Sequence, residues 1–187
     1  NSIVQIHSIV DKALGSLMGD GALSALSYGN TLGNLVVSVL VTSLTTVLYP
    51  NLSANIAEGN REKYEQSMVQ SLGGLTFIMI PILGITCLCS RDIVQIVYGR
   101  GSFNTEAITS TAVVLACYAP MFVACSVREV LTRGYFALQD TKTPMFNSAV
   151  GVVCNIVLSL ALAPIWGIAG ITIGTSVSTS ISAMLLL

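Results

Sequence analysis

Long apolar segments with almost no charge are the feature that most constrains this chain. Charged residues make up 9% of the 187 residues and hydrophobic residues 53%, whereas about a quarter of a soluble domain is charged. A helix needs about 20 mostly apolar residues to cross the core of a bilayer. Five segments meet that requirement, at roughly 32–49, 72–90, 107–127, 145–164 and 168–187. The sequence therefore predicts an all-α, polytopic bundle of membrane-spanning helices.

A sixth segment, at roughly 2–18, is apolar but more polar than the other five. It carries Gln5, His7, Asp11 and Lys12. Within a bundle it is interpreted as a sixth spanning helix with one wet face. The alternative is an amphipathic helix that lies on the membrane surface.

Turn residues mark where the expected helices end. Pro50 is expected to close the second helix, and a charged cytoplasmic connection follows over about 51–70. Within that connection, a solvated helix on the inner face of the membrane is expected over 54–70. Thr143 is placed to cap the fifth helix, with Pro144 at its first position.

The distribution of Lys and Arg predicts the orientation. Cytoplasmic loops carry an excess of these residues. One side of the expected bundle holds Arg61, Lys63, Arg128, Arg133 and Lys142, and the other holds Arg91 and Arg100. We therefore expect the 50–70 and 133–143 connections in the cytoplasm and residues 90–106 outside.

Composition and motifs exclude several classes of function. The 8 Lys and Arg residues form no basic run, so we expect no nucleic-acid partner. The sequence has no P-loop, and the single His7 has no nucleophile partner at a readable spacing, so we expect no enzyme and no cofactor. The cysteines are interpreted as small buried hydrophobic residues; they are Cys87, Cys89, Cys117, Cys125 and Cys154.

Polar side chains set deep in apolar sequence are the strongest functional signal. Such groups are costly at bilayer depth unless they are paired or hydrated. Asp11 lies near the middle of the first expected helix and Thr175 near the middle of the last. Asn155 and Ser159 are four residues apart and share one face of the fifth. Carboxylate, amide and hydroxyl oxygens and a freed backbone carbonyl are hard ligands that suit a small cation.

The same residues have a structural interpretation that stays open at this point. Asn155 and Thr175 would hydrogen-bond neighbouring helices, as polar side chains do in membrane bundles. Asp11 would then pair with Lys12 or His7, and no ion would be bound.

Three stretches carry a resemblance to one family. Residues 98–103 read Y-G-R-G-S-F, similar to the family's Y-G-R-G-x-F turn. Residues 133–144 read R-G-Y-F-A-L-Q-D-T-K-T-P, which resembles its signature of an Arg, an aromatic pair, A-L-x-D and T-K-T-P. Residues 48–53 read L-Y-P-N-L-S, a stretch shared more loosely. Together they resemble the MurJ (MviN) family of lipid II flippases, in the MOP transporter superfamily.

This resemblance implies that residues 1–187 are the second six-helix lobe of a two-lobe transporter, helices seven to twelve of about fourteen. Such a protein lies in the bacterial cytoplasmic membrane and works with the remaining helices around a central cavity. It carries an undecaprenyl-linked, anionic peptidoglycan precursor to the outer leaflet. The alternatives are another MOP exporter, either a polysaccharide-lipid flippase or a drug/cation antiporter, and a non-transporting scaffold for cell-wall synthesis.

The resemblance also implies a sodium site. It places the ligands at Asp11, Asn155, Ser159 and Thr175 and at the carbonyl of Ile171. The family's site has an acidic residue where this chain has Ser159, so one negative charge is absent.

Substrate contacts in the cavity follow from the same resemblance. The family often has an Arg in the second helix, in the pattern Y-A-x-R-L, whereas residues 28–32 here read Y-G-N-T-L, with Asn30 before Thr31 and Thr31 in place of the Arg. Phosphate binding by this lobe is therefore weakened unless Lys12 supplies the charge. Arg128, near the cytoplasmic end, is either an entrance for the anionic headgroup or a side chain that snorkels to the interface.

Overall fold

The computed structural model of the chain describes residues 9, 13, 15, 20–99 and 103–187. Within them lie α2 (Asp20–Ala57), α3 (Arg61–Tyr98), α4 (Thr105–Ala137), α5 (Lys142–Trp166) and α6 (Ile168–Met184). By length and composition, four of these helices could cross a membrane, and α6 is a shorter apolar helix. The predicted all-α membrane bundle is confirmed. Most of the expected first helix, with Asp11 and Lys12, lies outside the described residues.

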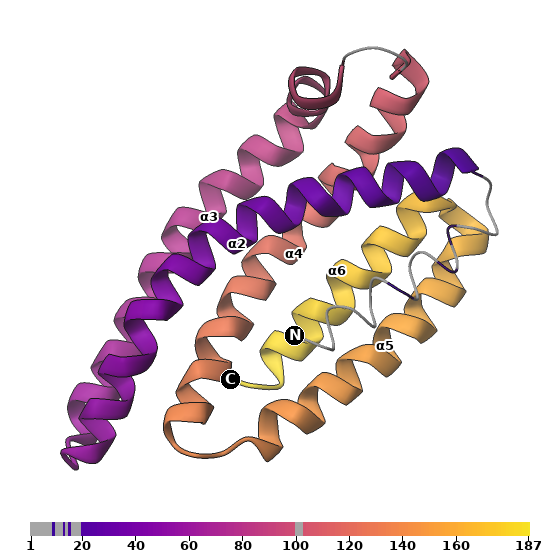
Figure 1. Ribbon diagram of the computed structural model, residues 1–187. Helices are drawn as coiled ribbons and strands as arrows, with labels where there is room; N and C mark the ends of the chain where they lie inside the picture. Colours follow the sequence, from indigo (N-terminus) through magenta and orange to yellow (C-terminus); the bar gives the residue numbers. More distant parts are fainter. Residues whose placement is uncertain (1–8, 10–12, 14, 16–19, 100–102) are drawn as a thin grey trace.

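Helix α4 is the centre of the described bundle. It packs along α2, α3 and α6, whereas α2 and α3 contact each other much less. Helices α5 and α6 form an antiparallel pair beside α4 (Figure 1). The close crossing of α2 over α4 depends on Gly33, since a Cβ there would lie 2.7 Å from Phe122 Cε1.

Two apolar clusters hold the helices together. One joins α2, α3, α4 and α6 through residues that include Leu32, Val94, Phe122 and Ile171. The other joins α2, α3 and α4 around Leu52 and Met79 among others. Outside these clusters α3 is largely exposed and apolar, as expected for a helix that faces lipid.

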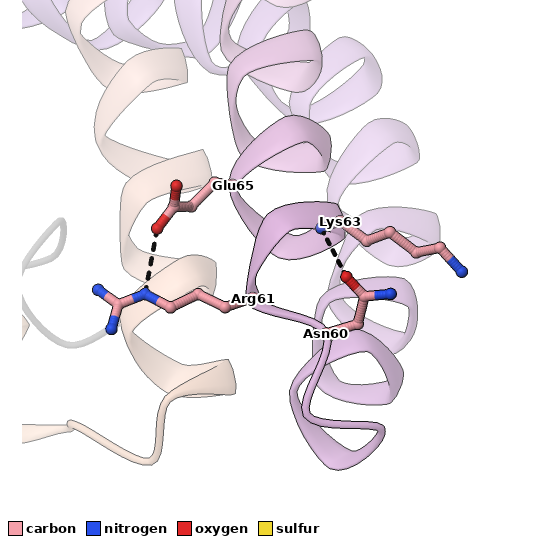
Figure 2. Close-up of polar contacts among 4 residues, drawn as sticks. All are labelled: Asn60, Arg61, Lys63 and Glu65. Carbon is pink, nitrogen blue, oxygen red and sulfur yellow. Dashed lines mark hydrogen bonds and ion pairs between the residues drawn. The ribbon is translucent and has the colours of Figure 1, made fainter.

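The two turns whose flanking helix residues include Arg61, Lys63, Arg133 and Lys142 lie at the same end of the bundle, which we call the hairpin end and define by residues 58–60 and 138–141. A cavity of about 330 Å³ there is lined by Arg61 and Tyr64 on one side and by Leu138 on the other. Figure 2 shows the start of α3, where Asn60 Oδ1 accepts the backbone N–H of Lys63 and Arg61 pairs with Glu65 at 3.1 Å. This shared end is what the predicted orientation requires, while the orientation itself remains a prediction.

Three aromatic rings pack against one another at the opposite end of the bundle. Tyr28 of α2, Tyr98 at the end of α3 and Phe103 before α4 form a cluster, with ring centroids 4.8 to 5.8 Å apart. Arg100 lies outside the described residues.

The expected end of the second helix is wrong. Pro50 lies inside α2, which continues to Ala57, and α3 begins at Arg61. No separate surface helix covers 54–70, because the two long helices occupy that stretch and leave only a short turn. A proline is tolerated inside a membrane helix where neighbouring groups satisfy the backbone that it frees.

The expected cap of α5 is also corrected. The Asp140 carboxylate accepts the backbone N–H groups of Lys142 and Thr143 at 3.0 and 3.1 Å, and the Thr143 hydroxyl donates to it at 2.6 Å. Thr143 is thus a partner of the cap, and Pro144 lies within the first turn. The hydrogen bonds from Thr143 lower the pKa of Asp140 below its ordinary value, with a smaller contribution from the charge of Lys142.

The cysteines are less buried than predicted. Cys87 is exposed, and the other four are half-buried. The Cys87 thiol donates to the carbonyl of Ala116 at 3.8 Å. That carbonyl is four residues before Pro120, which has no N–H to offer it. Cys87 therefore acts as a weak donor to freed backbone in α4.

The topology predicts that the starts of α3 and α4 lie on opposite sides of the membrane. Glu62 and Glu106 are matched positions, because each is exposed and is the second residue of a helix after an Asn cap. In a background without native cysteines, we expect an impermeant thiol reagent to label Glu62→Cys only from the cytoplasm and Glu106→Cys only from outside. Labelling of both from one side would contradict the topology.

Candidate functional site

The structure brings together three of the five residues predicted to bind a cation. Asn155 Nδ2 of α5 donates to the Thr175 hydroxyl of α6 at 2.9 Å, and that hydroxyl donates to the carbonyl of Ile171 at 3.1 Å. All three residues are buried, with at most 4% of their surface exposed. Asn155 and Thr175 meet near the middle of both helices, as the sequence predicted, and the Ile171 carbonyl lies one turn before Thr175.

Ser159 lies one turn further along the same face of α5. It is fully buried, and within the described part of the chain its hydroxyl has no hydrogen-bond partner. A Cβ on Gly174 would lie 3.0 Å from Ser159 Oγ, so this glycine allows α6 to approach Ser159. Asn155 Oδ1 is also buried and unpaired among the described residues.

The described oxygens fit a small hard cation in type and burial. Two of them lack a partner, and buried polar atoms of that kind are costly unless something binds them. All are neutral, however, and α6 is continuous at Ile171, so its carbonyl is not freed by a break in the helix. Asp11, the predicted charged ligand, lies outside the described residues. The hydrogen bond from Asn155 to Thr175 is also what the structural interpretation predicted, and both interpretations are compatible with the geometry.

The predicted cavity residues on α2 belong to a polar face on which Thr31, Asn34 and Ser38 are exposed and Asn30 is half-buried. Asn34 Nδ2 donates to Asn30 Oδ1 at 2.6 Å, and the Thr31 hydroxyl donates to the carbonyl of Ser27 at 2.8 Å. Ser38 extends the same face by one more turn. The face is uncharged, since Asp20 is the only charged residue in α2. Spacings of three and four residues align these side chains along the helix. The sequence analysis identified Asn30 and Thr31 but not the rest of the face.

Arg128 lies near the hairpin end of α4 and away from that polar face. It is half-buried, and its Nη2 is 3.5 Å from the hydroxyl of Ser148 on α5. Arg133, one turn later, pairs with Glu129 at 3.0 Å. Both arginines thus have local partners, and a role for Arg128 toward a headgroup remains a prediction.

Comparison with known proteins identifies relatives over the whole chain. A family model described as lipid II flippase MurJ matches residues 1–187. A probable lipid II flippase MurJ of Rhizobium tropici is 28% identical over 182 residues, which are 97% of this chain and 34% of that protein. One of Vibrio cholerae is 27% identical over 186 residues, 99% of this chain and 35% of that protein. The chain thus spans about a third of the curated relatives that it matches.

Solved structures show the same fold. Lipid II flippase MurJ in an inward closed conformation superposes with a TM-score of 0.91 at 24% identity, covering 99% of this chain and 39% of that one. An outward-facing multidrug resistance transporter of the MATE family, in the MOP superfamily, superposes with a TM-score of 0.84 at 15% identity, covering 99% and 40%. The chain therefore shares the fold of one part of each of these two proteins.

The bond between Asn155 and Thr175 should stabilise the pairing of α5 with α6. Thr175 and Thr179 are a matched pair, because both are buried and each hydroxyl donates to a carbonyl one turn back. In sodium-free detergent solution, Thr175→Val should lower the free energy of unfolding by about 1–3 kcal/mol more than Thr179→Val, since it leaves the Asn155 amide unpaired. Equal losses would show that this bond contributes nothing.

Proposed function

The chain belongs to the MurJ family of lipid II flippases, and we propose that it forms one lobe of a transporter that moves lipid II to the outer leaflet of the cytoplasmic membrane. The observation that carries the proposal is the family match over residues 1–187. The chain is a multi-pass part of a bacterial inner-membrane protein, and its family are transporters, not enzymes. Because the chain covers about a third of its relatives, the other lobe and further helices complete the proposed transporter.

The polar face of α2 supports a role in transport. Exposed amide and hydroxyl groups are disfavoured against lipid, so at bilayer depth they line water-filled cavities or contact protein. Asn30, Thr31, Asn34 and Ser38 form such a face. In the proposed transporter, this face is part of the cavity wall along which the precursor headgroup passes.

The absence of positive charge on this face indicates which part of the precursor it contacts. Pyrophosphate binding favours Arg, Lys or backbone N–H donors, and α2 has no Lys or Arg. Neutral amides and hydroxyls instead suit the hydroxyl and amide groups of a sugar–peptide headgroup. We assign binding of the pyrophosphate mainly to residues outside α2.

A monovalent cation, sodium, at Asn155, Ser159, Thr175 and the Ile171 carbonyl is the proposed coupling site, with Asp11 as its charged ligand. The buried, unpaired oxygens of Asn155 and Ser159 support it. A bound ion would favour one conformation of the transporter only through a difference in affinity between conformations. Removing sodium should therefore slow transport without removing the lobe from the membrane.

Depletion of the intact protein tests the proposed function. In cells with no other flippase, lipid-linked precursor should accumulate on the inner leaflet, as measured by its protection from an external modifying enzyme. A scaffold that only binds synthesis partners would leave the outer-leaflet precursor at its normal level, and that result would rule out flipping.

The cavity assignment of α2 can be tested with a new charge. Thr31→Arg should be tolerated because Thr31 is exposed on the polar face. Phe77→Arg on α3 is the contrasting variant, because Phe77 is 78% exposed among apolar residues. A charge facing lipid costs about 2.5–3.5 kcal/mol on insertion, so Phe77→Arg should reduce the amount of inserted protein more strongly. Equal losses of inserted protein would place both residues in the same environment.

A further inference from the structure

The seam between α5 and α6 contains a concentration of buried, unpaired oxygens. Six buried side-chain polar atoms have no hydrogen-bond partner within the described residues, and four of them lie on this seam. They are Asn147 Oδ1, Asn155 Oδ1, Ser159 Oγ and Ser182 Oγ. Each of the four residues is at most 5% exposed. Native interiors rarely leave such groups unpaired, so four on one seam require an explanation.

These oxygens form a line along the seam. Asn147, Gly151, Asn155 and Ser159 follow one another at intervals of four residues, so they share one face of α5. A rise of 1.5 Å per residue makes the line about 18 Å long. Only Asn155 and Ser159 belong to the candidate cation site, and the Asn147 end lies outside it.

Asn147 and Ser182 form the part of the line that lies nearest the hairpin end. Asn147 Nδ2 donates to the backbone carbonyl of Ser182 at 2.8 Å, which leaves Asn147 Oδ1 unpaired. A Cβ on Gly151 would lie 3.1 Å from Ser182 Oγ. Gly151 therefore keeps space beside that hydroxyl, midway between Asn147 and Asn155.

A groove at the hairpin end reaches Asn147. It has a volume of about 560 Å³ and is lined by Lys142, Thr143, Phe146, Asn147, Val150 and Leu185. Asn147 is thus both a wall of the groove and the first residue of the line. Of the four residues with unpaired oxygens, Asn147 is the one that lines this groove.

The unpaired oxygen atoms along the line determine which kind of ligand can bind there. The two amide oxygens only accept hydrogen bonds or coordinate a cation, and they would repel an anion, whereas the two hydroxyls can both donate and accept. At the mouth, the Asp140 carboxylate accepts the backbone N–H of Lys142, and the charge of Lys142 contributes to lowering the pKa of Asp140, so both signs of charge are present at this end. The guanidinium of Arg128 is directed to Ser148. The line therefore suits water and a small monovalent cation.

We propose that the α5–α6 seam is a hydrated path through which a small monovalent cation exchanges between the hairpin-end groove and the site at Asn155, by way of Asn147 and Ser182. The proposal rests on the proposed cation site, but it concerns residues that are not ligands of that site. Asn147 and Ser182 contact the ion or its water as it passes along the path. Their removal should change the rate of exchange and leave the affinity nearly unchanged.

The test measures binding and exchange of ²²Na⁺ on the intact transporter in detergent. Ser182→Ala removes one unpaired oxygen, and Gly151→Ala fills the space beside it. Both should keep the sodium Kd within about twofold and slow exchange by about tenfold. Ser178→Ala is the matched control, since Ser178 is buried one turn away and its hydroxyl donates to the Thr175 carbonyl. It should exchange sodium at the wild-type rate.

The variant Asn155→Leu distinguishes a failure of the proposed path from a failure of the proposed site. If it abolishes sodium binding while Ser182→Ala and Gly151→Ala exchange at the wild-type rate, the site stands and the path is overturned. A rise in melting temperature for Ser182→Ala would agree with that outcome, because a dry seam gains stability when an unpaired polar atom is removed. If Asn155→Leu binds sodium normally, or the wild-type protein binds none, both the site and the path are overturned, and flipping itself is still decided by the depletion experiment.

Discussion

Satisfaction of backbone polar groups in an apolar solvent is the constraint on which this structure depends. In lipid no water is available to unpaired N–H and C=O groups, so spanning segments must form helices or closed barrels. The described helices accordingly run through Pro50, Pro81 and Pro120 without ending. The group freed before Pro120 finds a partner on a neighbouring helix, since the Cys87 thiol donates to the Ala116 carbonyl.

The same constraint explains which parts of the fold could be predicted from the sequence. The lengths of the apolar segments identified the described helices and their order, because the thickness of the bilayer core sets how long a spanning helix must be. It failed at Pro50 and over 54–70, since rules for helix ends come from chains in water, where a proline stops a helix more readily. The cap of α5 was misplaced from Asp140 to Thr143 because both residue types make good caps and only geometry selects between them.

The candidate site was predictable where helix periodicity fixes geometry. A spacing of four residues placed Asn155 and Ser159 on one face, and equal depth in neighbouring helices brought Asn155 to Thr175. Asn147 and Ser182 were missed, because one lies close to a helix start and the other among many hydroxyl residues of α6. These two residues matter because their side-chain oxygens are unpaired. Whether a buried oxygen is paired depends on how the helices pack, which the spacing of residues in the sequence does not show.

The site and the polar face of α2 lie on different helices, and the core provides a physical connection between them. Ile171 contributes its carbonyl to the site and buries its side chain in the apolar cluster that also contains Phe122. Phe122 packs against Gly33, which lies between Thr31 and Asn34 of the polar face. Because well-packed cores have low compressibility, a shift of α6 at Ile171 would be transmitted toward α2 through this cluster. In the proposed transporter, an ion that favours one position of α6 would therefore also favour one position of the polar face of α2, and a substrate bound at that face would change the ion's affinity by the same factor.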